Sequence, residues 1–223
     1  MIIPKTKRKI FAPGCAIMLY KPELAAKLHS MLIELFGEMD MLMTCCKHDP
    51  GLNEPTEIIN VCPGCDKRFG SMYPNATTVS LWELLAGSDA FPFPDYDGKT
   101  VTILDACPTR EKPHIHTAIR TLLDRMNINL TEPQHTRTNS ICCGDSFYPQ
   151  LPPVKVNALM RKRASEMPRE DVVVYCVSCI QSMGIGGKTP RYLPDLLLGL
   201  ETKPEILPTD VWHSELDVYI ESH

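Results

Sequence analysis

The ten cysteines of this 223-residue chain fall into two sets that follow the same order. Each set begins with a single cysteine, continues with two adjacent cysteines and ends with two cysteines separated by two residues. This repetition indicates an internal duplication, and it predicts two related cysteine-rich units, residues 1–97 and 98–200, followed by a C-terminal tail, residues 201–223. The first set is Cys15, Cys45, Cys46, Cys62 and Cys65, and the second set is Cys107, Cys142, Cys143, Cys176 and Cys179.

The two sets differ in their spacing. Residues 108–141 and 144–175 separate the members of the second set, whereas only residues 16–44 and 47–61 separate those of the first. The extra residues of the second unit coincide with an amphipathic segment that is expected to form a helix from about Pro153. The first unit lacks this segment, so we expect a different substrate or a more open pocket beside its cysteines.

Strand-like and helix-like segments alternate through both units. Residues 7–15 and 99–108 are β-rich runs that end at a loop cysteine, and apolar residues with helical spacing follow at 22–37 and 115–126. Short strands are also expected to lead into the paired cysteines, at residues 39–46, 57–65, 136–144 and 171–179. The alternation predicts an α/β fold of two pseudo-symmetric βα repeats with mainly parallel sheets, in which the cysteine loops lie at the strand ends.

Composition narrows the function. A chain of this length with 43% hydrophobic residues can build its own cores without disulfides. Ten cysteines in the reducing cytoplasm, where we expect this protein, are typical of metal binding or redox chemistry and not of a structural disulfide set. A formal charge of −4 argues against nucleic acid as a partner. The first eleven residues lack the apolar stretch of a secretion signal, and no run approaches the ~20 apolar residues of a membrane span.

The cysteine pattern favours metal clusters over single ions. Thiolates are soft ligands that suit iron–sulfur clusters, zinc or copper(I). Adjacent cysteines rarely bind one small ion together, whereas a multi-iron cluster can accept both. Gly14, Gly64 and Gly144 are expected to let the backbone approach sulfur closely. The segment 62–65, Cys-Pro-Gly-Cys, also resembles a thioredoxin-type dithiol, but its place in the repeat favours a ligand role.

The second set, with its Cys142-Cys143-Gly144 triplet and the closing residues Leu-Pro-Asp-Leu-Leu-Leu-Gly, resembles the "CCG" domain that occurs in duplicate in the disulfide-cleaving subunit of heterodisulfide reductase. The resemblance extends over residues 8–200. It implies that each set of five cysteines holds a non-cubane [4Fe-4S] cluster, and that a small thiol disulfide is reduced or formed between the two clusters. The first set departs from the pattern, because Lys47 and His48 follow its adjacent pair in place of glycine.

Two alternatives remain open. Zinc could occupy the first site, which would make the chain a non-catalytic electron-transfer subunit with one cluster, and a zinc-only interaction module is a further alternative. No flavin motif or closely spaced ferredoxin motif is present. Electrons are therefore expected from a partner like the iron–sulfur electron-transfer subunit of heterodisulfide reductase, with a flavin subunit as an optional member beyond it.

Few other residues carry recognisable chemistry. His48 adjoins the first cysteine pair, and His114 and His116 follow Cys107, so His48 and His114 are candidate proton donors for disulfide reduction. Asp105 and Asp145 flank the second set, but no hydrolase triad or phosphate-binding loop accompanies them.

Overall fold

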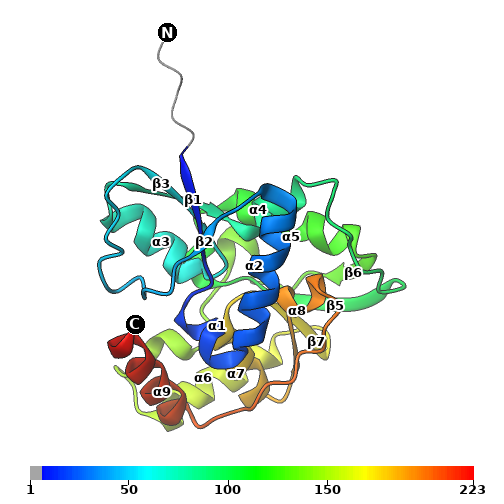
Figure 1. Ribbon diagram of the computed structural model, residues 1–223. Coiled ribbons are helices and arrows are strands. Elements are labelled where there is room, and N and C mark those ends of the chain that lie inside the picture. The colour runs from blue at the N-terminus through cyan, green and yellow to red at the C-terminus, as the bar shows by residue number, and fades with distance from the viewer. Residues whose placement is uncertain (1–6) are drawn as a thin grey trace.

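The computed structural model describes residues 7–223, so the first six residues, part of the basic start, lie outside it. Two four-stranded, fully parallel sheets form the framework, with the strand orders β2-β1-β3-β4 and β6-β5-β7-β8 (Figure 1). The predicted α/β class and parallel pairing are confirmed. The strands are β1 (Arg8–Ala12), β2 (Asp40–Met41), β3 (Thr56–Asn60), β4 (Ala76–Ser80), β5 (Lys99–Leu104), β6 (Ile128–Thr131), β7 (Asp171–Val174) and β8 (Thr189–Tyr192).

The helices of the first repeat begin and end where local sequence signals are strong. Helix α2 has Pro22 at its first position, and Gly37 ends it with a φ of 88° that favours glycine. Helix α4 begins at a capping box in which Ser80 and Glu83 satisfy each other's backbone N–H groups. The four helices are α1 (Cys15–Tyr20), α2 (Pro22–Phe36), α3 (Pro63–Met72) and α4 (Leu81–Ala86).

The second repeat contains the additional helix that the sequence predicted, α6, and its buried face includes Val156 and Met160. One continuous core runs through both repeats, from Leu28 of α2 to Val101 of β5 and Leu122 of α5. The two repeats are therefore packed into a single body. The remaining helices are α5 (Pro113–Arg125), α6 (Pro153–Ser165), α7 (Val177–Ile185), α8 (Leu193–Leu197) and α9 (Thr209–Ser222).

The expected strand over residues 136–144 is wrong. A 3₁₀ turn occupies Arg137–Asn139, and the residues from there to Gly144 have no regular structure. Asp105 explains the difference, because its carboxylate accepts hydrogen bonds from the Thr136 hydroxyl and the Arg137 backbone N–H at 2.9 and 2.7 Å. These bonds, together with the positive φ of Arg137, turn the chain away from the sheet. The edge strand beside β5 is instead β6, which precedes residues 136–144 in the chain.

The two repeats are also joined by reciprocal ion pairs from the lysines that precede α2 and α5. Lys21 donates to the fully buried Asp195 of α8 at 2.7 Å, and Lys112 pairs with the buried Asp66 of α3. Each lysine therefore reaches into the other repeat. Within residues 7–223, none of the helices combines the length and the apolar character that crossing a lipid bilayer requires.

Candidate functional site

The cysteine-bearing loops lie at the carboxyl ends of the parallel strands, as the sequence predicted. Cys15 follows β1 and Cys62 follows β3, while Cys107 follows β5 and Cys176 follows β7. In both sheets the chain places its second strand on one side of the first strand and its third on the other. Such a switch point opens a crevice at the carboxyl edge of a parallel sheet.

The structure brings the five thiols of the first repeat together in a ring, and all ten cysteines are free. The Cys45 thiol lies 3.9 Å from that of Cys15. All five cysteines line one cavity, and Cys65 lies close enough to Cys46 and Cys62 to lower the pKa of both. Cys62 in turn lies close enough to Cys15 to raise its pKa. We call this set the first thiol ring.

The second thiol ring has the same order of contacts. Cys107 and Cys143 lie close enough to Cys142 to lower its pKa, and Cys143 and Cys176 lie close enough to Cys179 to raise its pKa. Cys176 also lies close enough to Cys107 to raise its pKa, as Cys62 does for Cys15 in the first ring. The internal duplication therefore extends from the strand order to the contacts of individual sulfur atoms.

Glycines bring backbone N–H groups to sulfur in both rings. The Gly144 N–H donates to Cys142 Sγ at 3.3 Å, and backbone N–H groups of Gly64 and Cys65 lower the pKa of Cys62. Gly14, with φ +86°, leaves no free space for a side chain, because a Cβ there would lie 3.2 Å from Cys62 Cβ.

The thiols of each ring differ in acidity. Hydrogen bonds from Cys65 and from backbone N–H groups lower the pKa of Cys62 to about 7, although burial opposes the change. In the second ring, hydrogen bonds from Cys107 and Cys143 lower the pKa of Cys142. Burial and the neighbouring Cys45 and Cys62 raise the pKa of Cys15 to about 12. Thiolate character is thus concentrated on one or two members of each ring.

A cavity of about 260 Å³ joins the two rings. All five first-ring cysteines line it, and Cys176 lines it from the second ring. Its other walls are largely apolar, with Lys47 as a cation among the lining residues. A group in this cavity can therefore touch both rings.

Two tyrosines at the cavity were not singled out by the sequence. Tyr192, at the end of β8, is 2% exposed, and burial together with Cys62 and Cys176 raises its pKa well above the ordinary value. Tyr175 precedes Cys176, and its hydroxyl donates to Asp105 at 3.1 Å. Their positions at the ends of β7 and β8 are the signal that could have identified them.

Helix α9 covers the cavity. Leu216 and Ile220 are among the lining residues, and the backbone N–H of Cys45 donates to the carbonyl of His223 at 3.0 Å. At its other end the helix reaches the second ring, where His213 lies 3.0 Å from Asp145. The expected more open pocket is therefore not observed, because the C-terminal segment supplies the cover that the shorter first repeat lacks.

The histidines occupy different surroundings. His48 Nε2 lies 2.8 Å from the carbonyl of Ile220, so His48 anchors α9 beside the first ring. The His114 side chain is 57% exposed and lies 4.0 Å from Glu83. His116 is buried, contacts the Thr109 hydroxyl at 3.0 Å, and has its pKa lowered by burial.

A network of polar side chains centred on Asp105 holds the loop that leads to Cys107 in the second ring. Arg120 donates two hydrogen bonds to Asp105, at 2.6 and 2.8 Å, and two to Glu132, at 3.0 and 2.8 Å. Although burial opposes it, the contact with Arg120 lowers the pKa of Asp105 to about 2. Because Asp105 lies two residues before Cys107, this network fixes the loop that carries Cys107.

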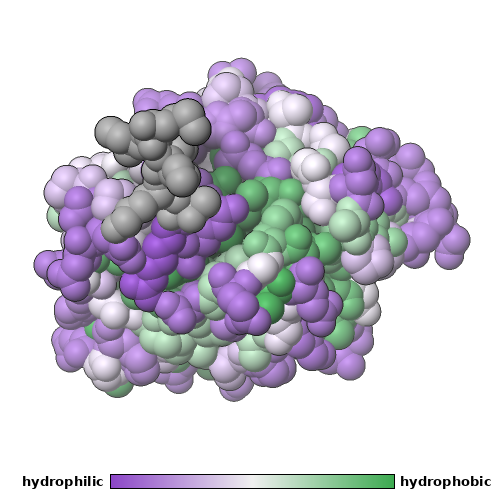
Figure 2. All heavy atoms as spheres, turned by 45° about the horizontal axis from the view of Figure 1, so that its top comes forward, coloured by the Kyte–Doolittle hydropathy of each residue, from purple (hydrophilic) through white to green (hydrophobic). Residues whose placement is uncertain are grey.

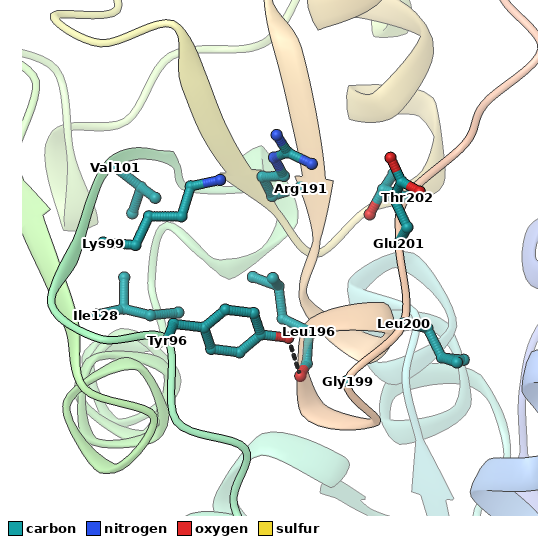
Figure 3. Close-up of a pocket in the computed structure, with 10 residues that line it drawn as sticks. All are labelled: Tyr96, Lys99, Val101, Ile128, Arg191, Leu196, Gly199, Leu200, Glu201 and Thr202. Atoms are coloured by element: carbon teal, nitrogen blue, oxygen red, sulfur yellow. Dashed lines mark hydrogen bonds between the residues drawn. The ribbon is translucent and has the colours of Figure 1, made fainter.

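A separate cavity of about 240 Å³ contains no cysteine (Figure 3). Lys99 and Arg191 line it, but both also pair with Asp171. Its floor includes Tyr96, whose hydroxyl donates to the carbonyl of Leu196 at 2.7 Å. The recognisable redox groups therefore lie at the thiol rings and not here.

Within residues 7–223, no group of three or more histidine, cysteine, aspartate or glutamate side chains is placed so that it could hold a metal ion. Comparison with known proteins found no family model that matches the chain and no matching curated protein.

Proposed function

We propose that this chain is the iron–sulfur catalytic subunit of a cytoplasmic complex similar to heterodisulfide reductase. It would reduce or form a small thiol disulfide between two non-cubane [4Fe-4S] clusters. The observation that carries the proposal is that two thiol rings with the same contacts meet at one cavity, which the first ring and Cys176 line together. Two related positions beside one cavity suit the two sulfur atoms of a disulfide.

The donor set suits iron–sulfur clusters by its chemistry, although within residues 7–223 the side chains are not placed to hold a single metal ion. Each ring offers five soft sulfur donors, and the members of its adjacent pair face different neighbours, since Cys45 contacts Cys15 while Cys46 contacts Cys65. A multi-iron cluster can accept such diverging thiolates. Backbone N–H groups that donate to Cys62 and Cys142 are the contacts that stabilise the negative charge of a reduced cluster.

The reaction converts one disulfide, two electrons and two protons into two thiols, or proceeds in reverse. When bound, the clusters would supply single electrons and an iron position for each sulfur. The chain itself contributes the cavity, in which Ile17, Val177 and Leu216 provide apolar walls that restrict water. Tyr192 remains protonated there, because burial keeps its pKa well above neutrality.

The complex is expected to include a partner like the iron–sulfur electron-transfer subunit of the reductase, with a flavin subunit as an optional member beyond it. Figure 2 shows a band of apolar side chains across one face of the molecule, surrounded by polar ones. Contiguous apolar surface of this kind often marks contact with another protein. It supports a chain that works as part of an assembly.

Metal analysis tests the proposal. The protein is purified without oxygen, and iron, sulfide and zinc are measured for the wild type, Cys15→Ser and Cys107→Ser. We expect iron and sulfide equivalent to two four-iron clusters in the wild type, and about half of it in each variant. One cluster with stoichiometric zinc would instead support the electron-transfer alternative, and zinc without iron would support the interaction module.

Substrate binding is tested by electron paramagnetic resonance with a panel of small thiols. A thiol that binds iron in the cavity changes the signal of the oxidised protein. Replacing Val177 with Phe fills the cavity without removing a ligand, and it should abolish this change while leaving the iron content intact. A signal that no thiol alters would contradict direct substrate binding.

A further inference from the structure

The second thiol ring reaches the molecular surface at a place separate from the shared cavity. Cys142 lines an outer hollow of about 200 Å³ together with Ile141, Phe147, Leu159 and Lys162. Ile141 and Phe147 are 38% and 44% exposed, so two large apolar side chains meet at this hollow.

This ring therefore has an outer and an inner side. Cys142 contacts Cys107 and Cys143 within the ring and faces the outer hollow. Cys176, the last member of the same ring, faces the inner cavity beside the first ring. A redox group held by the second ring would lie between the surface and the substrate cavity.

The surroundings of the outer hollow are basic, although the chain as a whole has a charge of −4. Lys155, one turn before Leu159, and Lys162 are exposed on the face of α6 that lines the hollow, and within residues 7–223 they form no ion pair. The carboxylates nearby are already engaged, since Asp145 pairs with His213 and Glu166 with the buried Arg163. The exposed charge at this surface is thus positive.

We propose that Ile141, Cys142, Phe147 and Leu159, with the basic side chains of α6, form the docking surface for an acidic iron–sulfur electron carrier. An apolar centre with a charged surround is suited to short-lived redox complexes, in which opposite charge speeds encounter. Each encounter oxidises the carrier by one electron and reduces the second site by one. Two encounters supply the two electrons that one disulfide consumes. This inference rests on the proposed function for its purpose.

The test measures how fast reduced bacterial ferredoxin, an acidic iron–sulfur protein, reduces the anaerobically purified chain. Reversing charge with Lys155→Glu and Lys162→Glu together should slow reduction about tenfold or more at low ionic strength, and added salt should shrink the difference. Phe147→Ser should also slow it. The matched controls are Lys27→Glu on α2 and Met72→Ser on α3, which are exposed outside this surface and should not change the rate.

Two further measurements keep the outcomes separate. The methyl viologen radical, a small cationic donor, should reduce all variants at least as fast as the wild type. Zero-length carbodiimide coupling to ferredoxin should form cross-links at Lys155 and Lys162 and not at Lys27, whether or not metal is bound.

If the protein contains no iron, viologen reduces nothing and the proposed function fails, while the cross-links still test the docking surface. If iron is present and viologen reacts, an unchanged ferredoxin rate in the charge-reversed variant overturns the docking surface alone. Cross-links between two copies of the chain at Lys162, in place of ferredoxin, would assign this surface to self-association and overturn the proposal.

Discussion

Replacing Gly144 with alanine should damage the second site through two distinct effects. Gly144 has a φ of +112°, a region that residues with a Cβ rarely adopt. An added Cβ would also lie 2.9 Å from both the Cγ and the backbone N of Met160 in α6. The loop with Cys142 and helix α6 would have to move apart.

The magnitude follows from adding these effects. The left-handed backbone costs an alanine about 1–2 kcal/mol, and overpacking against a helix costs about 1–3 kcal/mol. Lower entropy of the unfolded chain offsets about 0.4–1 kcal/mol. The free energy of unfolding should therefore fall by about 3 kcal/mol.

Two other glycines separate the contributions. Gly37 has a φ of +88°, but a Cβ added there would have nothing within 4 Å, so Gly37→Ala carries only the backbone cost. Gly186 has ordinary dihedral angles, but its Cβ would lie 2.2 Å from Ala164 Cβ, so Gly186→Ala carries only the steric cost. Gly37→Ala should lose less stability than Gly144→Ala, whereas Gly186→Ala shows how much a closer contact costs without backbone strain.

Urea unfolding of the anaerobically purified proteins, followed by circular dichroism, compares the midpoints at equal slopes. Iron analysis should show in addition that Gly144→Ala loses about half of its iron, whereas Gly37→Ala keeps it. If Gly144→Ala unfolds at the same urea concentration as Gly37→Ala, the contact with Met160 does not constrain the loop and the reasoning is refuted.

Three further outcomes are expected. Asp105→Asn should lower the free energy of unfolding by about 2 kcal/mol at pH 7, because the pKa of Asp105 is about 2 in the folded protein and 3.8 ordinarily. The stabilisation by the ionised carboxylate is complete above pH 4 and is lost as the pH falls toward 2. Thermal unfolding of the metal-free protein should therefore show a smaller difference between wild type and variant at pH 3. Lys112→Met should cost about 3 kcal/mol or more by leaving buried Asp66 unpaired, and adding Asp66→Asn should recover much of the loss in urea unfolding. Replacing both Leu216 and Ile220 with alanine should widen the cavity and speed iodoacetamide labelling of the first thiol ring in the metal-free protein. Labelling of Cys142, which does not line the cavity, should keep its rate and serves as the control.

Much of the fold was predictable because its signals are local. The repeated cysteine order, the alternation of strand and helix patterns, and Pro22 and Gly37 at the ends of α2 depend on neighbouring residues only. The extra helix α6 was likewise visible as an amphipathic segment in the longer repeat. The grouping of five cysteines per repeat followed from parallel strands, whose carboxyl ends share one edge.

The remaining features depend on contacts between distant segments. Residues 136–144 look like a strand by composition, but the carboxylate of Asp105, about 30 residues earlier, accepts their backbone and hydroxyl hydrogen bonds. The approach of Cys176 to the first ring and the placement of Tyr192 require the packing of two whole repeats. The C-terminal tail gave no sign that it would cover the cavity, since α9 is fixed there by His48 and Cys45, more than 170 residues away.

The asymmetry between the repeats can be traced to one insertion. Helix α6 exists only in the second repeat, and its Leu159 and Lys162 build the hollow that exposes Cys142. The first repeat has no such helix, and α9 closes over its ring, so that all five of its cysteines face the inner cavity. Duplication of a thiol ring would by itself yield two equivalent sites. The insertion in one copy and the covering of the other instead leave Cys142 at an outer hollow and enclose the first ring around the inner cavity, which is the asymmetry we would expect if the proposed disulfide chemistry is supplied with single electrons through the second ring.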